Sequence, residues 1–287
     1  MTNGTVGGLP ARFTKMAGAG NDFLVFGERV PIGSREAETI RSVCRRGTGV
    51  GADGVLFVES VRRGDETRVL LDYYNADGGR ARFCANGTRC AARFAKERLG
   101  AGERSVVATD WGDVPASIRD GTVTLRLPEP VALGARVSSF DRGTRLLEPE
   151  AVAVTVGVPH LVVFTAEGVE VETLDLAPLG PALRRHPDLP EGANVNFTTP
   201  RGPSRLAVRS WERGVEAETL SCGSGVVASA VVAGLLRGEE PPVTVATRSG
   251  AVLAVDFRVE GALACDVTLT GDARFVFEGT LCEEVLG

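Results

Sequence analysis

The sequence predicts an α/β protein made of two similar domains. Both halves of the 287-residue chain alternate short β-branched, apolar runs with longer segments of helical spacing, the pattern of mixed α/β proteins. A chain of this length suits two domains of about 140 residues, each large enough to bury its own core. The third observation is an internal repeat.

The repeat has a constant offset. Cys84 and Cys222, each at the start of a Gly-containing turn, are 138 positions apart (222 − 84). The same offset aligns residues 23–26 with 161–164, residues 107–109 with 245–247, and Gly112 with Gly250. A constant offset without a gap indicates duplication of one architecture. If the two domains pack about a pseudo-twofold axis, the two thiols are expected to face each other across the cleft between them.

The first domain is predicted to span residues 1–129. Its opening segment, residues 1–10, is polar and Gly-rich and is interpreted as a loose tail. Turn residues at Asn75-Ala76-Asp77-Gly78-Gly79 and Asp120-Gly121 separate the strand-like runs that follow. Strands are expected at residues 23–26, 55–58, 69–74, 106–109, 114–118 and 123–127, and helices at 35–45 and from the first cysteine turn to about 99.

The second domain is predicted to span residues 130–271, after the Pro-containing break at residues 127–130. Residues 157–160 are interpreted as a loop between two strands. The helix that follows Cys222 and runs to about residue 236 is apolar nearly all round, which predicts that it is the buried centre of its domain. A last strand near residues 274–277 exceeds the repeat, so residues 272–287 are expected to complete the first domain.

Composition excludes several classes of protein. A net charge of −5 gives no electrostatic footprint for nucleic acid or for an anionic membrane. The longest apolar run, residues 226–236, is too short to span a bilayer. Six cysteines in a chain without a signal-peptide pattern favour reduced thiols in the cytoplasm.

Two turns carry the chemistry, Cys84-Ala85-Asn86-Gly87 and Cys222-Gly223-Ser224-Gly225. Each leads directly into a helical pattern. A thiol at the N-terminus of a helix lies in a positive potential that favours the thiolate. The free N–H groups of the same turn can hold a carboxylate. Two such turns therefore predict a site with two reactive thiols and seats for a carboxylate.

Two opposed thiols can invert a stereocentre. The thiolate removes a proton from carbon while the other, protonated thiol delivers a proton to the opposite face. Oriented N–H groups stabilise the charge that develops when the weakly acidic α-proton of an amino acid is removed. Pyridoxal phosphate would need a Schiff-base lysine, and the two lysines, Lys15 and Lys96, lie in no phosphate-cradling context. A cofactor-free mechanism follows.

Several long segments, in the same order, resemble the signature segments of the diaminopimelate epimerase family. These are residues 15–23, 75–78, 84–90, 212–219 and 222–225, and the similarity runs from about residue 11 to residue 281. The resemblance implies two pseudo-symmetric α/β domains, each a β-barrel-like sheet wrapped around a central helix. It also implies PLP-independent interconversion of LL- and meso-2,6-diaminopimelate in lysine and cell-wall biosynthesis, usually by a homodimer.

The resemblance also implies roles for single residues. Cys84 and Cys222 would be the acid/base pair, and His160 would lie beside the cleft, orienting the site or assisting thiol ionisation. The reacting carboxylate would be held by Asn86, Gly87, Gly223 and Ser224. A zwitterionic distal end needs a guanidinium for its carboxylate and oxygens for its ammonium. The residues expected to bind that end are Asn21, Asn75, Asn194, Glu212 and Arg213.

Three positions depart from the family pattern and leave the choice of substrate open. Val158 stands where many members have Asn before Pro-His, Gly54 where some have Gln, and Ala85 where Gly is more frequent. The alternative substrate class is another amino acid, such as histidine or proline, for a racemase of the same fold. The pair Glu212-Arg213 discriminates, because a substrate without a second amino-acid end has less use for it.

Several of these residues also have a purely structural interpretation. Cys44, Cys90, Cys265 and Cys282 are interpreted as small buried hydrophobes, and Asn21 and Asn75 as possible turn formers. Arg213 has the alternative of pairing with Glu212 or Glu218. A zinc site is disfavoured because the chain has only two histidines and no second cysteine pair of matching spacing. A disulfide oxidoreductase would need a Cys-x-x-Cys pair, and a non-catalytic binding protein would have no need for both thiols.

Overall fold

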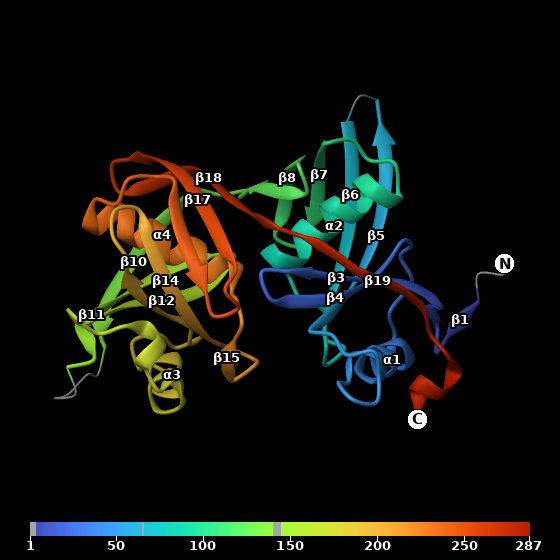
Figure 1. Ribbon diagram of the computed structural model, residues 1–287, viewed down its shortest axis with the longest axis horizontal. Coiled ribbons are helices and arrows are strands. Elements are labelled where there is room, and N and C mark those ends of the chain that lie inside the picture. The colour runs from blue at the N-terminus through green and yellow to red at the C-terminus, as the bar shows by residue number, and fades with distance from the viewer. Residues whose placement is uncertain (1–3, 65, 140–144) are drawn as a thin grey trace. The chain divides into compact units, whose positions relative to one another are not determined.

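The chain folds into two compact units of helices and strands (Figure 1). The structure, a computed structural model, describes residues 4–64, 66–139 and 145–287. One unit comprises Met1–Pro128 with Gly271–Gly287, and the other comprises Glu129–Thr270. The α/β class predicted from the sequence is confirmed. Within the described ranges, no helix combines the length and the apolar character needed to cross a membrane.

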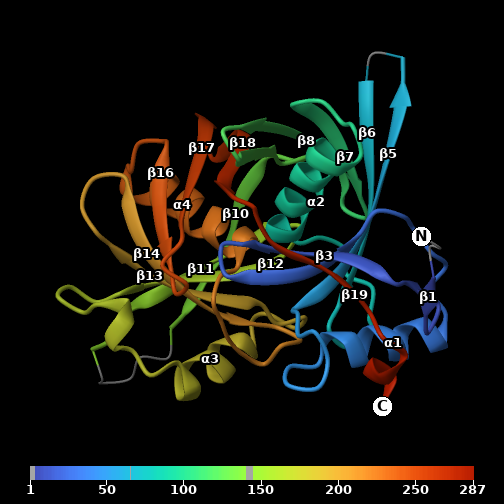
Figure 2. The ribbon, with the colours of Figure 1, turned by 45° about the vertical axis from the view of Figure 1, so that its right-hand side comes forward.

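The first unit wraps a sheet around one helix. Helix α2 (Ala85–Arg98) packs against β3 through β9. The strands, in hydrogen-bonded order, are β19 (Arg274–Thr280), β3 (Arg12–Gly18), β4 (Asn21–Phe26), β5 (Gly54–Arg63), β6 (Glu66–Asn75), β7 (Arg104–Thr109), β8 (Gly112–Arg119) and β9 (Thr122–Arg126). The pairs β4–β5 and β6–β7 are parallel and the others antiparallel. Figure 2 shows β19 beside β3, where the chain returns to the first unit.

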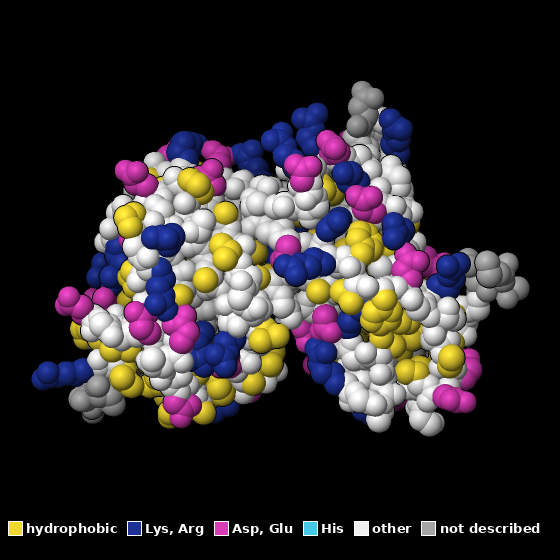
Figure 3. Space-filling model, viewed as in Figure 1, with side chains coloured by type: hydrophobic (Ala, Val, Ile, Leu, Met, Phe, Trp, Pro, Cys, Tyr) yellow, Lys and Arg dark blue, Asp and Glu magenta, His cyan; other side chains and the backbone are white. Residues whose placement is uncertain are grey.

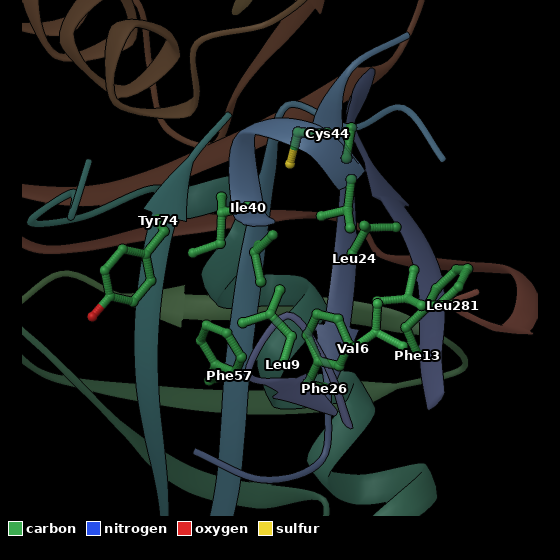
Figure 4. Packing of buried hydrophobic residues seen from close by; sticks show 13 residues of the cluster. Val6, Leu9, Phe13, Leu24, Phe26, Ile40, Cys44, Phe57, Tyr74 and Leu281 are labelled. Carbon is green, nitrogen blue, oxygen red and sulfur yellow. The ribbon is translucent and has the colours of Figure 1, made fainter. Parts of the chain in front are cut away.

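An aromatic and aliphatic core lies on the other side of this sheet, under helix α1 (Ser34–Cys44). Phe26 and Phe57 stack with ring centroids 5.4 Å apart, and Ile40 of α1 joins them (Figure 4). Leu9 and Leu281 bring both ends of the chain into the same cluster. The 3-10 helix η2 (Glu283–Leu286) also packs against α1.

The prediction of a loose tail at residues 1–10 is wrong for its described part. Strands β1 (Thr5–Val6) and β2 (Leu9–Pro10) form a hairpin, and Leu9 is fully buried. The Thr39 hydroxyl of α1 donates to the Gly7 carbonyl at 2.8 Å. Two apolar side chains in a polar, Gly-rich segment were enough to pack the hairpin on the core, because burying each one stabilises the fold by about 1.5–3 kcal/mol.

The second unit repeats this plan. Its described residues form an eight-stranded barrel, closed because β10 pairs with both β11 and β18. The strands are β10 (Val131–Ser138), β11 (Leu147–Val156), β12 (Val158–Thr165), β13 (Asn194–Pro200), β14 (Arg205–Glu212), β16 (Val243–Thr247), β17 (Val252–Glu260) and β18 (Leu263–Asp272). The parallel pairs β12–β13 and β14–β16 correspond in order to those of the first unit.

Helix α4 (Gly223–Arg237) occupies the centre of this barrel and is buried from Val226 to Ala233, so the prediction from its apolar sequence is confirmed. Outside the barrel, α3 (Leu176–Arg184) and the 3-10 helix η1 (Val171–Thr173) pack on β13 and β14. The short β15 (Ala217–Thr219) pairs with the end of β14.

The predicted loop at residues 157–160 is wrong. Gly157, with φ of 70°, makes a very tight turn, and β12 begins at Val158, paired with Val156. Pro159 fits in this strand because the second neighbour, β13, begins to pair only at His160. The missing N–H of proline therefore removes no bond to β13. The tight turn places His160 inside the barrel, 1% exposed.

Candidate active site

The first cysteine turn begins α2. Cys84 is the N-cap residue, in an extended conformation, and its sulfur accepts from the Gly87 N–H at 3.4 Å. The thiol therefore lies at the positive end of the helix, as predicted from the sequence. A Cβ at Gly87 would lie 3.2 Å from the Leu56 side chain. The small residue is needed because the first turn of α2 packs closely on the sheet.

Asn86 connects this turn to the neighbouring loops. Its side chain is 1% exposed, and its Nδ2 donates to Asn21 Oδ1 at 2.7 Å. Asn21 in turn donates through Nδ2 to Asp53 at 2.9 Å, and Arg89 donates to Asn86 Oδ1 at 2.7 Å. The structure thus joins two predicted site residues, Asn21 and Asn86, in one hydrogen-bonded chain beside Cys84.

Asn75 is exposed at the end of β6. Its side-chain oxygen accepts from the Tyr73 hydroxyl at 2.6 Å, and its backbone pairs with Gly78 and Gly79 across the turn. These are the contacts of a turn residue. Its role in substrate binding stays a prediction.

The second cysteine turn begins α4. Cys222 is the N-cap residue and is 7% exposed, and its sulfur lies 3.6 Å from the Ser224 hydroxyl oxygen. Gly225 follows, and a Cβ there would lie 2.0 Å from Asn196 Oδ1. The first turn of α4 therefore packs directly on the side chain of a buried asparagine from β13.

That asparagine connects to His160. The Ser210 hydroxyl donates to Asn196 Oδ1 at 2.9 Å, so the amide nitrogen faces His160 Nδ1, 3.1 Å away. Nδ1 then accepts and the ring proton resides on Nε2. Burial, with a smaller effect of the positive charge of Arg213, lowers the pKa of His160 to about 3. The imidazole is neutral at physiological pH and offers a hydrogen-bonding group rather than a positive charge.

Three of the five residues expected at the distal end of a substrate lie at the paired ends of β13 and β14 in the second unit. Asn194, at the start of β13, accepts through Oδ1 from the Arg213 backbone N–H at 2.8 Å. Thr219 donates to Glu212, and the Arg213 guanidinium donates to the Glu191 carbonyl at 3.0 Å. Glu218, the other alternative partner of Arg213, pairs with Arg209 at 2.6 Å and with Arg248 at 3.6 Å.

The remaining cysteines differ in exposure. Cys44, Cys90 and Cys265 are buried as predicted, whereas Cys282 is exposed, contrary to the prediction. Burial raises the pKa of the Cys44 and Cys90 thiols to about 12. Neither is ionised at neutral pH.

Four residues of these networks were not predicted from the sequence: Asp53, Arg89, Asn196 and Ser210. Two of these had a signal. Arg89 lies inside the segment from Cys84 to Cys90, and Asn196 is two residues from Asn194, on the same face of the strand. Asp53 and Ser210 join the network only through tertiary contacts.

Gly225→Ala is expected to lower the free energy of unfolding by about 1–3 kcal/mol, because the added methyl group must displace Asn196. Urea denaturation checks this. Gly102→Ala is the control, since its Cβ would be 3.7 Å from its nearest neighbour. Equal stability of the two variants would contradict the close packing of Asn196 on α4.

Comparison with known proteins places this geometry in a family. The sequence model of the family described as diaminopimelate epimerase matches residues 13–131 and 152–276. A protein of Aquifex aeolicus named diaminopimelate epimerase is 38% identical, over 96% of this chain and 99% of its own. One of the same name from Methanothrix thermoacetophila is also 38% identical, over 96% of this chain and 97% of its own.

Solved structures agree on the fold. A PhzF-family phenazine biosynthesis protein of Bacillus anthracis superposes with a TM-score of 0.68 at 14% identity, covering 95% of this chain and 99% of its own. A probable proline racemase of Agrobacterium radiobacter gives 0.65 at 16% identity, covering 95% and 93%. At these identities the similarity shows the fold alone. The sequence relationships show the family, and the resemblance seen in the signature segments is confirmed: the chain belongs to the diaminopimelate epimerase family of isomerases.

Proposed function

We propose that the chain interconverts LL- and meso-2,6-diaminopimelate without a cofactor, with Cys84 and Cys222 as the acid/base pair. The observation that carries the proposal is that the central helix of each unit begins at a cysteine N-cap. The same chemical arrangement thus occurs once in each copy of a duplicated fold. Family membership supports diaminopimelate as the substrate.

Each thiol serves one face of the α-carbon. The thiolate of one cysteine takes the α-proton, and the thiol of the other delivers a proton to the opposite side. Backbone N–H groups of Asn86-Gly87 and of Gly223-Ser224 hold the reacting carboxylate. They stabilise the negative charge that develops on it as the C–H bond breaks.

The distal end of the substrate determines specificity. Arg213 offers a guanidinium to its carboxylate, and Glu212 offers an acceptor to its ammonium. Asn194, Asn75 and Asn21 supply further polar groups. The neutral imidazole of His160 orients the site by hydrogen bonding.

Both lysines are engaged elsewhere, which supports a PLP-independent reaction. Lys15 is buried, pairs with Asp22 at 2.7 Å and donates to the Gly51 carbonyl. Lys96 lies on α2 near Glu97 and Glu103, at 3.9 and 3.8 Å. Neither lies at a cysteine turn. The proposed place of the enzyme is the cytoplasm, in the biosynthesis of lysine and peptidoglycan precursors.

Exchange of the α-proton in D₂O tests this function. Purified, reduced protein without cofactor is offered LL-diaminopimelate, meso-diaminopimelate, proline and histidine. Deuterium is expected at the α-carbon of diaminopimelate alone, with inversion. Exchange into proline or histidine would identify a different substrate for the same two-thiol mechanism. No exchange into any of these amino acids would favour a non-catalytic binding protein.

We propose further that the enzyme is a homodimer and that β19 contributes to the interface. Val276 and Phe277 on this strand are 56% and 49% exposed, and hydrophobic side chains gather over β19 and β3 (Figure 3). Exposed apolar patches of this kind mark interaction surfaces. Phe277→Glu is expected to give a monomer in sedimentation equilibrium. Val252→Glu, at a position 62% exposed in the second unit, is the control, and a wild-type monomer would contradict the proposal.

A further inference from the structure

A series of three side-chain hydrogen bonds, called here the hydrogen-bonded chain, lies next to the first cysteine turn. It runs from Arg89 to Asn86 (2.7 Å), from Asn86 to Asn21 (2.7 Å) and from Asn21 to Asp53 (2.9 Å). Every bond is donated in the same direction, from the guanidinium towards the carboxylate. The chain joins α2, the start of β4 and the loop before β5.

The residues at the two ends of the hydrogen-bonded chain, Arg89 and Asp53, determine the direction in which its hydrogen bonds are donated. A guanidinium can only donate, so Asn86 must present its oxygen to Arg89 and its nitrogen to Asn21. An ionised carboxylate can only accept, so Asn21 must present its nitrogen to Asp53 and its oxygen to Asn86. Turning either amide round would place two oxygens or two N–H groups against each other. Either end alone is therefore sufficient to set both amides.

Both end residues have further hydrogen-bond partners. Asp53 accepts from the Asp22 backbone N–H at 3.2 Å and pairs with Arg46 at 2.8 Å. Arg89 is 0% exposed and donates through Nε to the Asp272 carbonyl at 3.1 Å. The described residues place no carboxylate oxygen within ion-pair distance of its guanidinium.

Burial of such a cation is costly. Removing a charge from water without an ion-pair partner is strongly unfavourable, and the desolvation lowers the pKa of Arg89. Its Nη1 also has no hydrogen-bond partner among the described residues. An apolar side chain would fill this volume at lower cost, so packing alone does not account for a guanidinium here.

We propose that Arg89 and Asp53 are positioning residues that act as a pair, fixing the orientation of the Asn86 and Asn21 amides for the substrate. The proposal rests on the proposed function. A substrate carboxylate only accepts and an ammonium only donates, so an amide turned round presents the wrong group to either. Because each end suffices, the two residues are redundant: losing one preserves the orientation, and losing both releases it.

The test is a double-mutant cycle of Arg89→Met and Asp53→Ala in the full chain. Kinetics are measured with the amino acid that the wild type exchanges. The fall in kcat of the double variant is expected to exceed the product of the two single effects by about tenfold. Arg89→Lys in the Asp53→Ala background restores a donor-only end and is expected to recover most of that loss. If the two residues were merely structural, the fall in kcat of the double variant would equal the product of the two single effects, and Arg89→Lys would recover no activity.

A second readout needs no substrate. The side-chain amide signals of Asn21 and Asn86 in ¹⁵N-labelled protein are assigned by their loss in Asn21→Asp and Asn86→Asp. One set of these amide signals is expected in the wild type and in both single variants, because each amide has one orientation. Two sets of signals are expected in the double variant, one for each orientation. The matched control is Arg93→Met combined with Asp53→Ala. Like Arg89, Arg93 lies on α2 and donates to a backbone carbonyl of the same segment, that of Ala273 next to Asp272. It makes no hydrogen bond to Asn86 among the described residues.

The outcomes separate this inference from the proposed function. A single set of amide signals in a folded double variant, with additive kinetics, would overturn the positioning role whatever the substrate. Failure of the wild type to exchange diaminopimelate would overturn the function, and the amide signals would still decide the orientation. If Arg89→Met does not fold, Arg89→Gln takes its place, because a glutamine amide both donates and accepts and so no longer sets the direction. Values of kcat and amide signals for Arg89→Gln with Asp53→Ala equal to those of Asp53→Ala alone would overturn the proposal.

Discussion

Replacing Cys84 or Cys222 with alanine is expected to lower kcat/KM for epimerisation of diaminopimelate by at least about 10²- to 10⁴-fold, the usual contribution of a positioned acid or base. Inversion needs both thiols, because a proton must leave one face and arrive at the other. One remaining thiolate can still remove a proton from the face that it serves and return a solvent proton to the same face.

The two variants should therefore differ in a diagnostic way. One is expected to exchange the α-proton of the reacting centre only in LL-diaminopimelate, and the other only when that centre has the D configuration, both without inversion. Proton NMR in D₂O, with chiral separation of the products, checks this. Cys90→Ala is the control, because burial raises the pKa of that thiol to about 12. Full inversion by either active-site variant would exclude the two-thiol mechanism.

Acidification should destabilise the wild type more than His160→Gln. The pKa of His160 is about 3 in the folded protein and about 6.5 when unfolded. Between these values the unfolded chain binds a proton that the folded chain does not, so the free energy of unfolding falls as the pH falls from 6.5 towards 3. The loss is about 1.4 kcal/mol per pH unit, or about 2–3 kcal/mol between pH 6.5 and 4.5.

Urea denaturation of both proteins at pH 7 and pH 4.5 measures this difference. The carboxyl groups whose pKa is lowered on folding, Asp22 and Glu216, also cost stability in acid. Both carboxyl groups are present in the wild type and in His160→Gln. The difference between the two proteins in the stability lost from pH 7 to pH 4.5 is therefore the contribution of His160. Equal losses would show that the imidazole can be protonated in the folded protein, and its role as a neutral hydrogen-bonding group would then be wrong.

Much of the fold could be read from local sequence. The offset between Cys84 and Cys222 indicated the duplication, and each cysteine turn ran into a helical pattern that the structure places at the start of α2 and α4. N-capping, helical spacing and the apolar character of residues 226–236 are properties of neighbours along the chain. The sequence by itself therefore determined the two thiols, their helix ends and the family.

The rest depended on contacts between distant residues. The hairpin at Leu9 lies in a polar, Gly-rich segment, and burial of the leucine explains why it forms. The strand at Pro159 contains a proline, which is tolerated because β13 begins to pair only at His160. Arg89 meets the carbonyl of Asp272, 183 residues later, and reaches Asp53 only through two asparagines. Which buried polar groups become partners is determined by chain segments that meet only after folding. Tertiary structure alone therefore decided how the amides beside Cys84 and the imidazole of His160 are oriented, because an amide or a ring has no preferred direction until its donors and acceptors are in place.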